Sequence, residues 1–197
     1  MKIKLCGLRT VADALLCANE GADEIGVIFA PSSRRRVTVE EAKAIRDALP
    51  APVPLVGVFL DATLEQVERI AREVGLQAAQ LHGAWPAARA ALPLYAALQV
   101  LSEASLEPRP GAARVLLDGP AGGSGKNFAW TLAAKARTLH GGELFVGGGL
   151  TAGNVAQAIA EARPSGVDVA SGIEGKDGFK DRERVRAFVR AARRAAR

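Results

Sequence analysis

Residues that could do chemistry stand at the ends of several short apolar runs in this sequence. Cys6 ends the first run directly before Gly7, and His82 and Asp118 end two later ones. A thiol, an imidazole and a carboxyl group all exchange protons, which makes these positions candidate site residues. Cysteine is often only a small core residue, but the place of Cys6 at the end of a run and before a glycine favours a chemical role. Cys17 lies inside an expected helix and is interpreted as core.

Two loops near the end of the chain have the pattern of a phosphate site. Gly148 and Gly149 follow one apolar run, and Ser171 and Gly172 follow the next. Glycine lets a phosphate approach backbone N–H groups that a side chain would hold away. A short segment after Ser171 could form an extra helix whose N-terminus faces the same anion. The glycines of either loop could serve only as turns, but this explanation is weaker for two such loops after two successive apolar runs.

The elements that must position these residues alternate along the chain. Eight runs rich in Val, Ile and Leu predict strands at 3–6, 24–29, 53–60, 77–81, 95–101, 114–118, 144–146 and 167–170. Stretches of helical period lie between them. Three of these stretches open with an expected capping box, formed by Thr10 with Asp13, Thr38 with Glu41 and Thr63 with Gln66.

Strands that are nearly continuous in apolar residues indicate a parallel sheet covered on both faces. About eight strand and helix units without a linker predict one α/β domain over residues 1–197, a closed (β/α)₈ TIM barrel. The length is short for that fold, so we expect a stunted helix after the fifth strand, where Glu107 to Gly111 contains two prolines. An open doubly wound sheet is the competing architecture. In a barrel, the site lies at the carboxyl ends of the strands.

Composition excludes several classes of protein. The net charge of +5 comes largely from Arg34 to Arg36 and from the C-terminal residues 182–197, which have the spacing of a solvated helix face. With six Phe, two Trp and one Tyr, no nucleic-acid partner is expected. No apolar run is long enough for a membrane span, and two cysteines with no signal peptide suggest a cytoplasmic protein. Two histidines without nearby ligands give no metal site.

Two further motifs resemble those of other chemistries. Gly122 to Asn127 reads GGSGKN, but Pro120 stands five positions before Gly125 and Asn127 replaces the Ser or Thr that would hold magnesium in a P-loop, so a P-loop nucleotidase is rejected. Gly147 to Ala152 reads GGGLTA, a permissive dinucleotide fingerprint, but it comes near the end of the chain rather than at a first strand–helix turn. A nicotinamide-dependent oxidoreductase therefore remains an alternative, as does a phosphosugar-binding barrel without catalysis.

Several strings, taken together, carry a resemblance to a known family. They are KLCGLRTVADAL, GVIFAPSSRRRV, VGVF, QLHG, LLDG with GGSGKNFAW, GGGL with Asn154 and Val155, and GVDVASGIE with GFKD, spread in order from Lys4 to Asp181. The chain thereby resembles the phosphoribosylanthranilate isomerases of tryptophan biosynthesis.

The resemblance implies a cofactor-free Amadori rearrangement of a small phosphosugar, in which Cys6 is the general base and Asp118 the general acid. A thiol acts as a base only as thiolate, so we expect a lowered pKa at Cys6. Lys4, two residues earlier on the same strand, could supply the positive potential. We expect Lys4 to be buried and paired with Asp168.

The resemblance also implies the residues that bind the substrate. Arg35 would hold its carboxylate, although Arg34 and Arg36 are neighbours of the same type. Gly148, Gly149, Ser171 and Gly172 would bind the phosphate, and His82 would line the pocket. The glycine-rich loop from Gly119 to Phe128 has the composition of a lid. The sequence leaves open whether the chain is a monomer or a homodimer.

Overall fold

The computed structural model describes residues 1–100, 102, 105–119, 130 and 132–197. Eight parallel strands pair in chain order, and β1 pairs with both β2 and β8, so the sheet closes into a barrel. The strands are β1 (Lys2–Cys6), β2 (Glu24–Ile28), β3 (Leu55–Leu60), β4 (Ala78–His82), β5 (Leu94–Gln99), β6 (Arg114–Asp118), β7 (Glu143–Gly147) and β8 (Gly166–Val169). The predicted TIM barrel is confirmed, and the expected lid loop lies largely outside the described residues.

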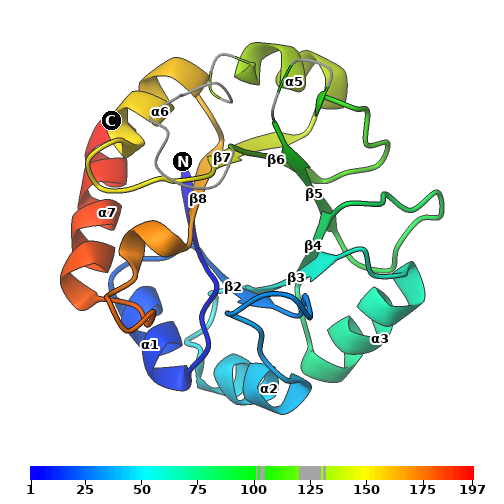
Figure 1. The fold of residues 1–197 in the computed structure, drawn as a ribbon, viewed down its shortest axis with the longest axis horizontal. Helices are drawn as coiled ribbons and strands as arrows, with labels where there is room; N and C mark the ends of the chain where they lie inside the picture. Colours follow the sequence, from blue (N-terminus) through cyan, green and yellow to red (C-terminus); the bar gives the residue numbers. More distant parts are fainter. Residues whose placement is uncertain (101, 103–104, 120–129, 131) are drawn as a thin grey trace.

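Helices surround the ring of strands (Figure 1). They are α1 (Val11–Asn19), α2 (Val39–Ala48), α3 (Leu64–Val74), α5 (Ala133–His140), α6 (Val155–Ala162) and α7 (Arg182–Ala195), with a 3₁₀ turn η2 (Ser171–Ile173) after β8. Their apolar faces pack on the outside of the strands and form one large core cluster. None of the helices in the described ranges is long and apolar enough to cross a membrane.

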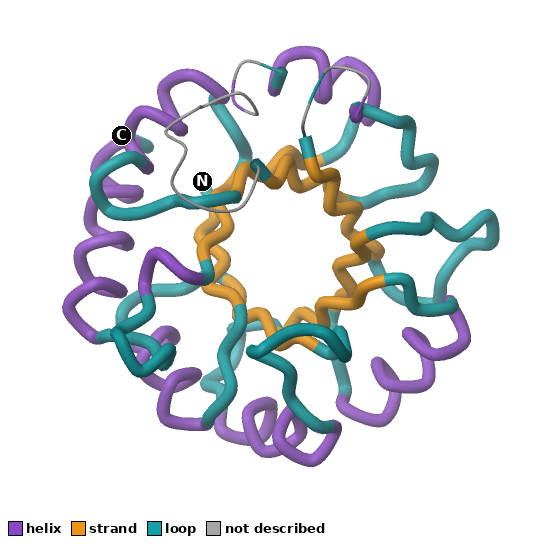
Figure 2. Tube along the Cα trace, in the orientation of Figure 1, coloured by secondary structure: helices purple, strands orange, loops and turns teal. Residues whose placement is uncertain are grey.

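One side of the barrel lacks the expected helix. Residues 83–93, between β4 and β5, are all described and contain no helix, so the prediction of a helix in every unit is wrong here. Only six residues separate Pro86 from Pro93, too few to offset the cost of starting a helix. The described residues between β5 and β6 contain no α-helix either, and loops border this side of the barrel (Figure 2).

Two of the three expected capping boxes are present. At Thr38 and Thr63 the side chain accepts from the third residue of the helix, whose own side chain accepts from the cap backbone. Thr10 accepts from the backbone of Asp13, but the Asp13 carboxylate accepts instead from the backbone N–H of Lys180, at 3.1 Å. Asp13 therefore attaches α1 to the segment before α7 rather than closing a capping box.

A buried ion cluster fills the N-terminal end of the barrel. The guanidinium of Arg114, at the start of β6, donates to both oxygens of Glu24 on β2, at 2.6 and 2.7 Å, and to Glu143 on β7, at 2.7 Å. It also lies 4.0 Å from the ring centroid of Tyr95 and 3.7 Å from that of Phe145. Since these strands lie on different sides of the ring, the cluster occupies the barrel interior and leaves the carboxyl ends of the strands for the site.

Candidate active site

A cavity of about 250 Å³ lies at the carboxyl ends of the strands. Residues from every strand except β7, and from the loops after β2, β6, β7 and β8, line it, so it is the place where the barrel brings distant parts of the chain together. Seven of the eight sequence-predicted site residues line this cavity: Cys6, Arg35, His82, Asp118, Gly148, Gly149 and Ser171. Gly172 is not among its lining residues.

Cys6 is the last residue of β1 and is buried. Burial raises the pKa of its thiol, and the nearby charges of Lys4 and Lys180 oppose that rise while Asp168 adds to it. The expectation of a lowered pKa is therefore wrong: in this structure desolvation outweighs the two lysines. Cys6 is a thiol over most of the neutral range, and its thiolate is a minor form.

Lys4 and Asp168 form a buried pair beside Cys6. The two residues face each other in the β1–β8 register, and Nζ of Lys4 lies 3.0 Å from Oδ1 of Asp168. The Lys4 side chain is 1% exposed, which confirms the expected buried pair. Burial alone would disfavour its charge, but Asp168 and Cys6 raise the pKa of Lys4 above its ordinary value. Lys4 is therefore a permanent positive charge next to the thiol.

Asp118 is the last residue of β6, across the cavity from β1. Burial and the nearby negative charge of Asp168 raise its pKa from 3.8 to about 6, against the opposing effect of Lys4. A carboxyl group with this pKa keeps its proton in about one molecule in ten at pH 7, far more often than an ordinary aspartate does. Asp118 can therefore donate a proton to a bound molecule.

His82 ends β4 and lies beside Gln80, which the sequence analysis did not single out. Nε2 of His82 is 3.0 Å from Nε2 of Gln80, and both residues line the cavity. Burial and the charge of Lys4 lower the pKa of His82, which favours the neutral ring. Gln80 could have been found from the strand period of two, because it precedes His82 by two residues and points to the same side.

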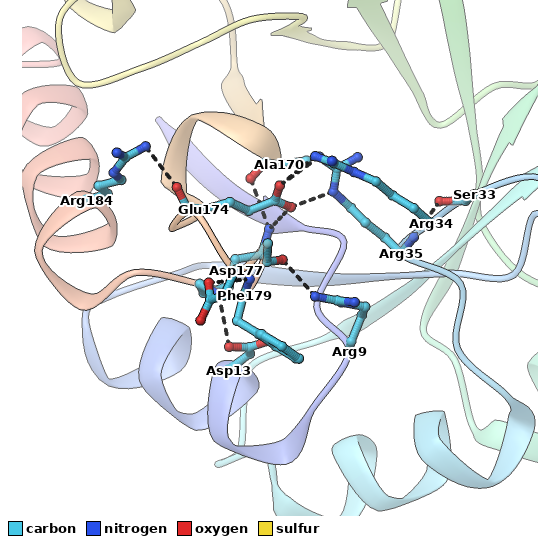
Figure 3. A network of polar contacts seen from close by, with 12 residues as sticks. Arg9, Asp13, Ser33, Arg34, Arg35, Ala170, Glu174, Asp177, Phe179 and Arg184 are labelled. Atoms are coloured by element: carbon cyan, nitrogen blue, oxygen red, sulfur yellow. Dashed lines mark hydrogen bonds and ion pairs between the residues drawn. The ribbon is translucent and has the colours of Figure 1, made fainter.

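Among the three consecutive arginines, Arg35 is the one that lines the cavity. Its side chain is 19% exposed, whereas that of Arg34 is 73% exposed. Nε and Nη2 of Arg35 donate to the two carboxylate oxygens of Glu174, at 2.5 and 2.9 Å (Figure 3). Glu174 follows η2, and the sequence analysis missed it because no local pattern connects residues 139 positions apart.

The loops after β7 and β8 require glycine for different structural reasons. Gly148 and Gly149 have φ angles of +77° and +66°, which other residues adopt only with strain. At Gly172, a side chain would collide with the carbonyl oxygen of Leu150. Gly172 thus lets η2 pack against the loop after β7, and Ser171 lines the cavity beside it.

The described part of the chain holds no group of three His, Cys, Asp or Glu side chains arranged for a metal ion. The cavity instead combines a thiol, a carboxyl group and an arginine, with the buried Lys4 beside the thiol. Such a set suits proton transfer on a small anionic molecule.

The comparison with known proteins agrees with this chemistry. The family model for N-(5'-phosphoribosyl)anthranilate isomerase matches residues 3–191. The chain belongs to the N-(5'-phosphoribosyl)anthranilate isomerase family. It is therefore an isomerase of tryptophan biosynthesis.

Similar members of the isomerase family cover the whole chain. The isomerase of Rubrobacter xylanophilus is 42% identical over 205 residues, covering 98% of each chain, and that of Symbiobacterium thermophilum is 39% identical over 224 residues, covering 100% of each. The crystal structure of the Thermotoga maritima isomerase superposes with a TM-score of 0.86 at 34% identity and 98% coverage of both chains. Another solved isomerase, with a TM-score of 0.85, 34% identity and 98% coverage of both chains, is in complex with reduced 1-(o-carboxyphenylamino)-1-deoxyribulose 5-phosphate.

Proposed function

We propose that the chain converts N-(5'-phosphoribosyl)anthranilate to 1-(2-carboxyphenylamino)-1-deoxyribulose 5-phosphate, with Asp118 as general acid and Cys6 as general base. The observation that carries the assignment is their placement. They end β6 and β1, two strands that are not neighbours in the ring, and both line one cavity of about 250 Å³. A sugar ring held between them would present one face to each group.

The proposed reaction needs one proton donor and one proton acceptor. Asp118 protonates the ring oxygen as its bond to C1 breaks, which leaves a protonated imine between C1 and the nitrogen. The Cys6 thiolate then removes the proton at C2, and the electron pair of that C–H bond forms the enolamine. A proton added at C1 and the loss of the enol proton give the ketone. C1 is reduced and C2 is oxidised within one molecule, so no external redox partner is required.

The protonation states of Asp118 and Cys6 determine the fraction of protein molecules that can react. Asp118 must be protonated while Cys6 is a thiolate, yet the pKa of Asp118 is about 6 and burial raises that of Cys6. Only a small fraction of molecules holds both in the reactive form at once. The adjacent charge of Lys4 stabilises the thiolate and so enlarges that fraction.

The substrate groups have separate binding regions in this proposal. Arg35 would hold the anthranilate carboxylate, since a guanidinium matches a carboxylate in shape and charge. Gly148, Gly149 and Ser171 would donate to the phosphate from the loops after β7 and β8, with Gly172 keeping these loops together. His82, in its neutral form, would line the sugar site.

The test follows the fluorescence of freshly prepared N-(5'-phosphoribosyl)anthranilate with wild type, Cys6→Ser and Asp118→Asn. We expect wild type to consume the substrate and each variant to lose about 10²- to 10⁴-fold in kcat. Cys17→Ser is the matched control, because Cys17 is buried in α1 and does not line the cavity. It should retain wild-type kcat.

Two outcomes would contradict the proposal. If wild type leaves the substrate unchanged, the barrel serves other chemistry, and titration with a nicotinamide dinucleotide tests the oxidoreductase alternative. If Cys6→Ser or Asp118→Asn keeps most of the wild-type kcat, the reaction stands but the assigned role of that residue is wrong.

A homodimer is a separate proposal for the assembly. Its support is a solved structure of monomers generated from the Thermotoga maritima isomerase, whose parent enzyme is described as dimeric; that structure is 33% identical to this chain, with a TM-score of 0.83 and 98% coverage of both chains. Sedimentation equilibrium should then give twice the chain mass of 20.5 kDa. A mass of one chain at micromolar concentration would contradict it.

A further inference from the structure

Glu174 is a buried carboxylate shared by several cations at the edge of the cavity. Its side chain is 5% exposed. Besides the two hydrogen bonds from Arg35, it accepts from Nζ of Lys180 at 3.2 Å and from Nη2 of Arg34 at 3.2 Å (Figure 3). Burial alone would raise the pKa of Glu174, but the hydrogen bonds and charges of Arg35 and Lys180 outweigh it and lower the pKa below its ordinary value, so Glu174 is a permanent negative charge.

The chain around Glu174 is fixed from several sides. Arg184 on α7 donates to its backbone carbonyl at 2.8 Å. Nζ of Lys180 also donates to the carbonyl of Ala170 at 3.0 Å, and the Lys180 backbone donates to Asp13 on α1. Glu174 therefore holds a position defined by β8, α1 and α7 rather than by a mobile side chain on the surface.

Arg35 lies between this fixed carboxylate and the corner after Cys6. A Cβ atom at Gly7 would lie 2.6 Å from Cδ of Arg35, so the arginine stem passes directly over the backbone at Gly7. With Nε and Nη2 engaged by Glu174, the N–H groups of Nη1 and the second N–H of Nη2 remain for another acceptor. The charges also remain unbalanced, because the single carboxylate of Glu174 is shared by Arg35, Lys180 and Arg34.

We propose that Glu174 is a positioning residue that holds the Arg35 guanidinium at the cavity wall, ready to bind the carboxylate of the substrate. This inference rests on the proposed function. An arginine ordered before binding loses little side-chain freedom on binding, and the surplus positive charge makes a second carboxylate favourable. Glu174 acts only through Arg35 and does not line the cavity itself.

The experiment is a double-mutant cycle measured on two substrates. The variants are Arg35→Met, Glu174→Gln and the combination, and the substrates are N-(5'-phosphoribosyl)anthranilate and N-(5'-phosphoribosyl)aniline, which lacks the carboxylate. With the anthranilate substrate, we expect Glu174→Gln to raise KM by about 10- to 100-fold while kcat changes little. The double variant should match Arg35→Met alone, because Glu174 has no effect without Arg35.

With the aniline substrate, followed by NMR, we expect wild type and Glu174→Gln to have the same KM. A purely structural role would impair both substrates alike, and that result would overturn the proposal. Additive effects in the double variant would also overturn it. Glu143→Gln is the matched control: Glu143 also accepts from a lysine and an arginine, Lys2 and Arg114, but at the other end of the barrel. It should leave KM unchanged.

Glu174→Gln leaves the buried Lys180 without its carboxylate partner and could therefore unfold the protein. A second variant covers this case. Glu174→Asp keeps a negative charge near Lys180 but is one methylene shorter and cannot reach Arg35 in the same geometry. If thermal melting shows that Glu174→Gln is unfolded, Glu174→Asp must show the same KM increase on the anthranilate substrate alone. A wild type inactive on both substrates would instead overturn the proposed function, and this inference with it.

Discussion

Gly26 on β2 stands next to Cys6 on β1 in the paired register of the two strands. A Cβ atom at Gly26 would lie 2.6 Å from Sγ of Cys6 and 3.2 Å from its Cα. Neither atom can move far, because the thiol ends a buried strand and Cα belongs to the backbone. The absence of a side chain at Gly26 therefore defines where the thiol lies.

We expect Gly26→Ala to displace the Cys6 thiol and to lower kcat by about 10²-fold, since small errors in the position of a reacting group are costly. The substrate contacts of Arg35 and the glycine loops are untouched, so KM should change little. Steady-state kinetics measure both values. Gly57→Ala is the control, because a Cβ there crowds Leu76 and Phe59 rather than Cys6. A wild-type kcat in Gly26→Ala would contradict the prediction.

The titration of Cys6 gives a second prediction. Burial raises the pKa of the thiol and Lys4 opposes the rise, so Lys4→Met should raise the pKa further. The absorbance of the thiolate near 240 nm, recorded against pH, measures the pKa of Cys6. Subtracting the same titration of Cys6→Ser removes the signal of Cys17, whose pKa burial raises to about 12. Wild type should titrate above the ordinary thiol pKa. A lower pKa in Lys4→Met than in wild type would exclude the assigned effect of Lys4.

The raised pKa of Asp118 predicts that this residue, although needed for activity, lowers the free energy of unfolding. The folded protein binds a proton at Asp118 up to about pH 6, whereas the unfolded chain releases it above its ordinary pKa of 3.8. The charged form therefore destabilises the folded state, fully above pH 6 and little below pH 4. Asp118→Asn removes this cost and should raise the free energy of unfolding by about 2 to 3 kcal/mol at pH 8.

Urea denaturation at pH 8 and at pH 4 checks the prediction. At pH 4 the gain should fall below about 1 kcal/mol, because the wild-type carboxyl group is then largely protonated in the folded state and partly so in the unfolded chain. A gain of the same size at both pH values would mean that the stabilisation has another cause.

The cluster at the other end of the barrel gives a prediction about stability alone. Arg114→Met leaves Glu24 buried without a partner and should cost about 3 to 5 kcal/mol of unfolding free energy. Adding Glu24→Gln should recover part of that loss. Lys2→Met removes an exposed partner of Glu143 and should cost less than about 1 kcal/mol. Thermal and urea denaturation measure these changes, and equal losses in Arg114→Met and Lys2→Met would disprove the special role of the buried pair.

Most of the barrel could be predicted from local signals. Apolar runs placed all eight strands, and the run 114–118 matches β6 at both ends. The missing helix after β4 could not be found in this way, because the alanine-rich residues between Pro86 and Pro93 have good helix propensity. Their length, rather than their composition, prevents the helix.

Site residues at the ends of strands could be predicted from the sequence. Residues that reach the site only because loops from distant segments pack together were harder to predict. Cys6, His82 and Asp118 follow from strand ends, and the Lys4–Asp168 pair follows from the closure of a barrel. Glu174 and Lys180 have no such signal, since Glu174 meets Arg35 and Lys180 only through the packing of loops. The pKa of Cys6 could not be predicted either, because it depends on how burial compares with the charges around it.

The pairing of β1 with β8 also has a consequence for the order of assembly. Lys4 leaves the ribosome before its partner Asp168, which follows 164 positions later. Until then, burying Lys4 would place an unpaired ammonium in an apolar interior. The strand β1 must therefore stay hydrated or loosely held while the other strands form, and the catalytic end of the barrel is completed only after β8 has been synthesised.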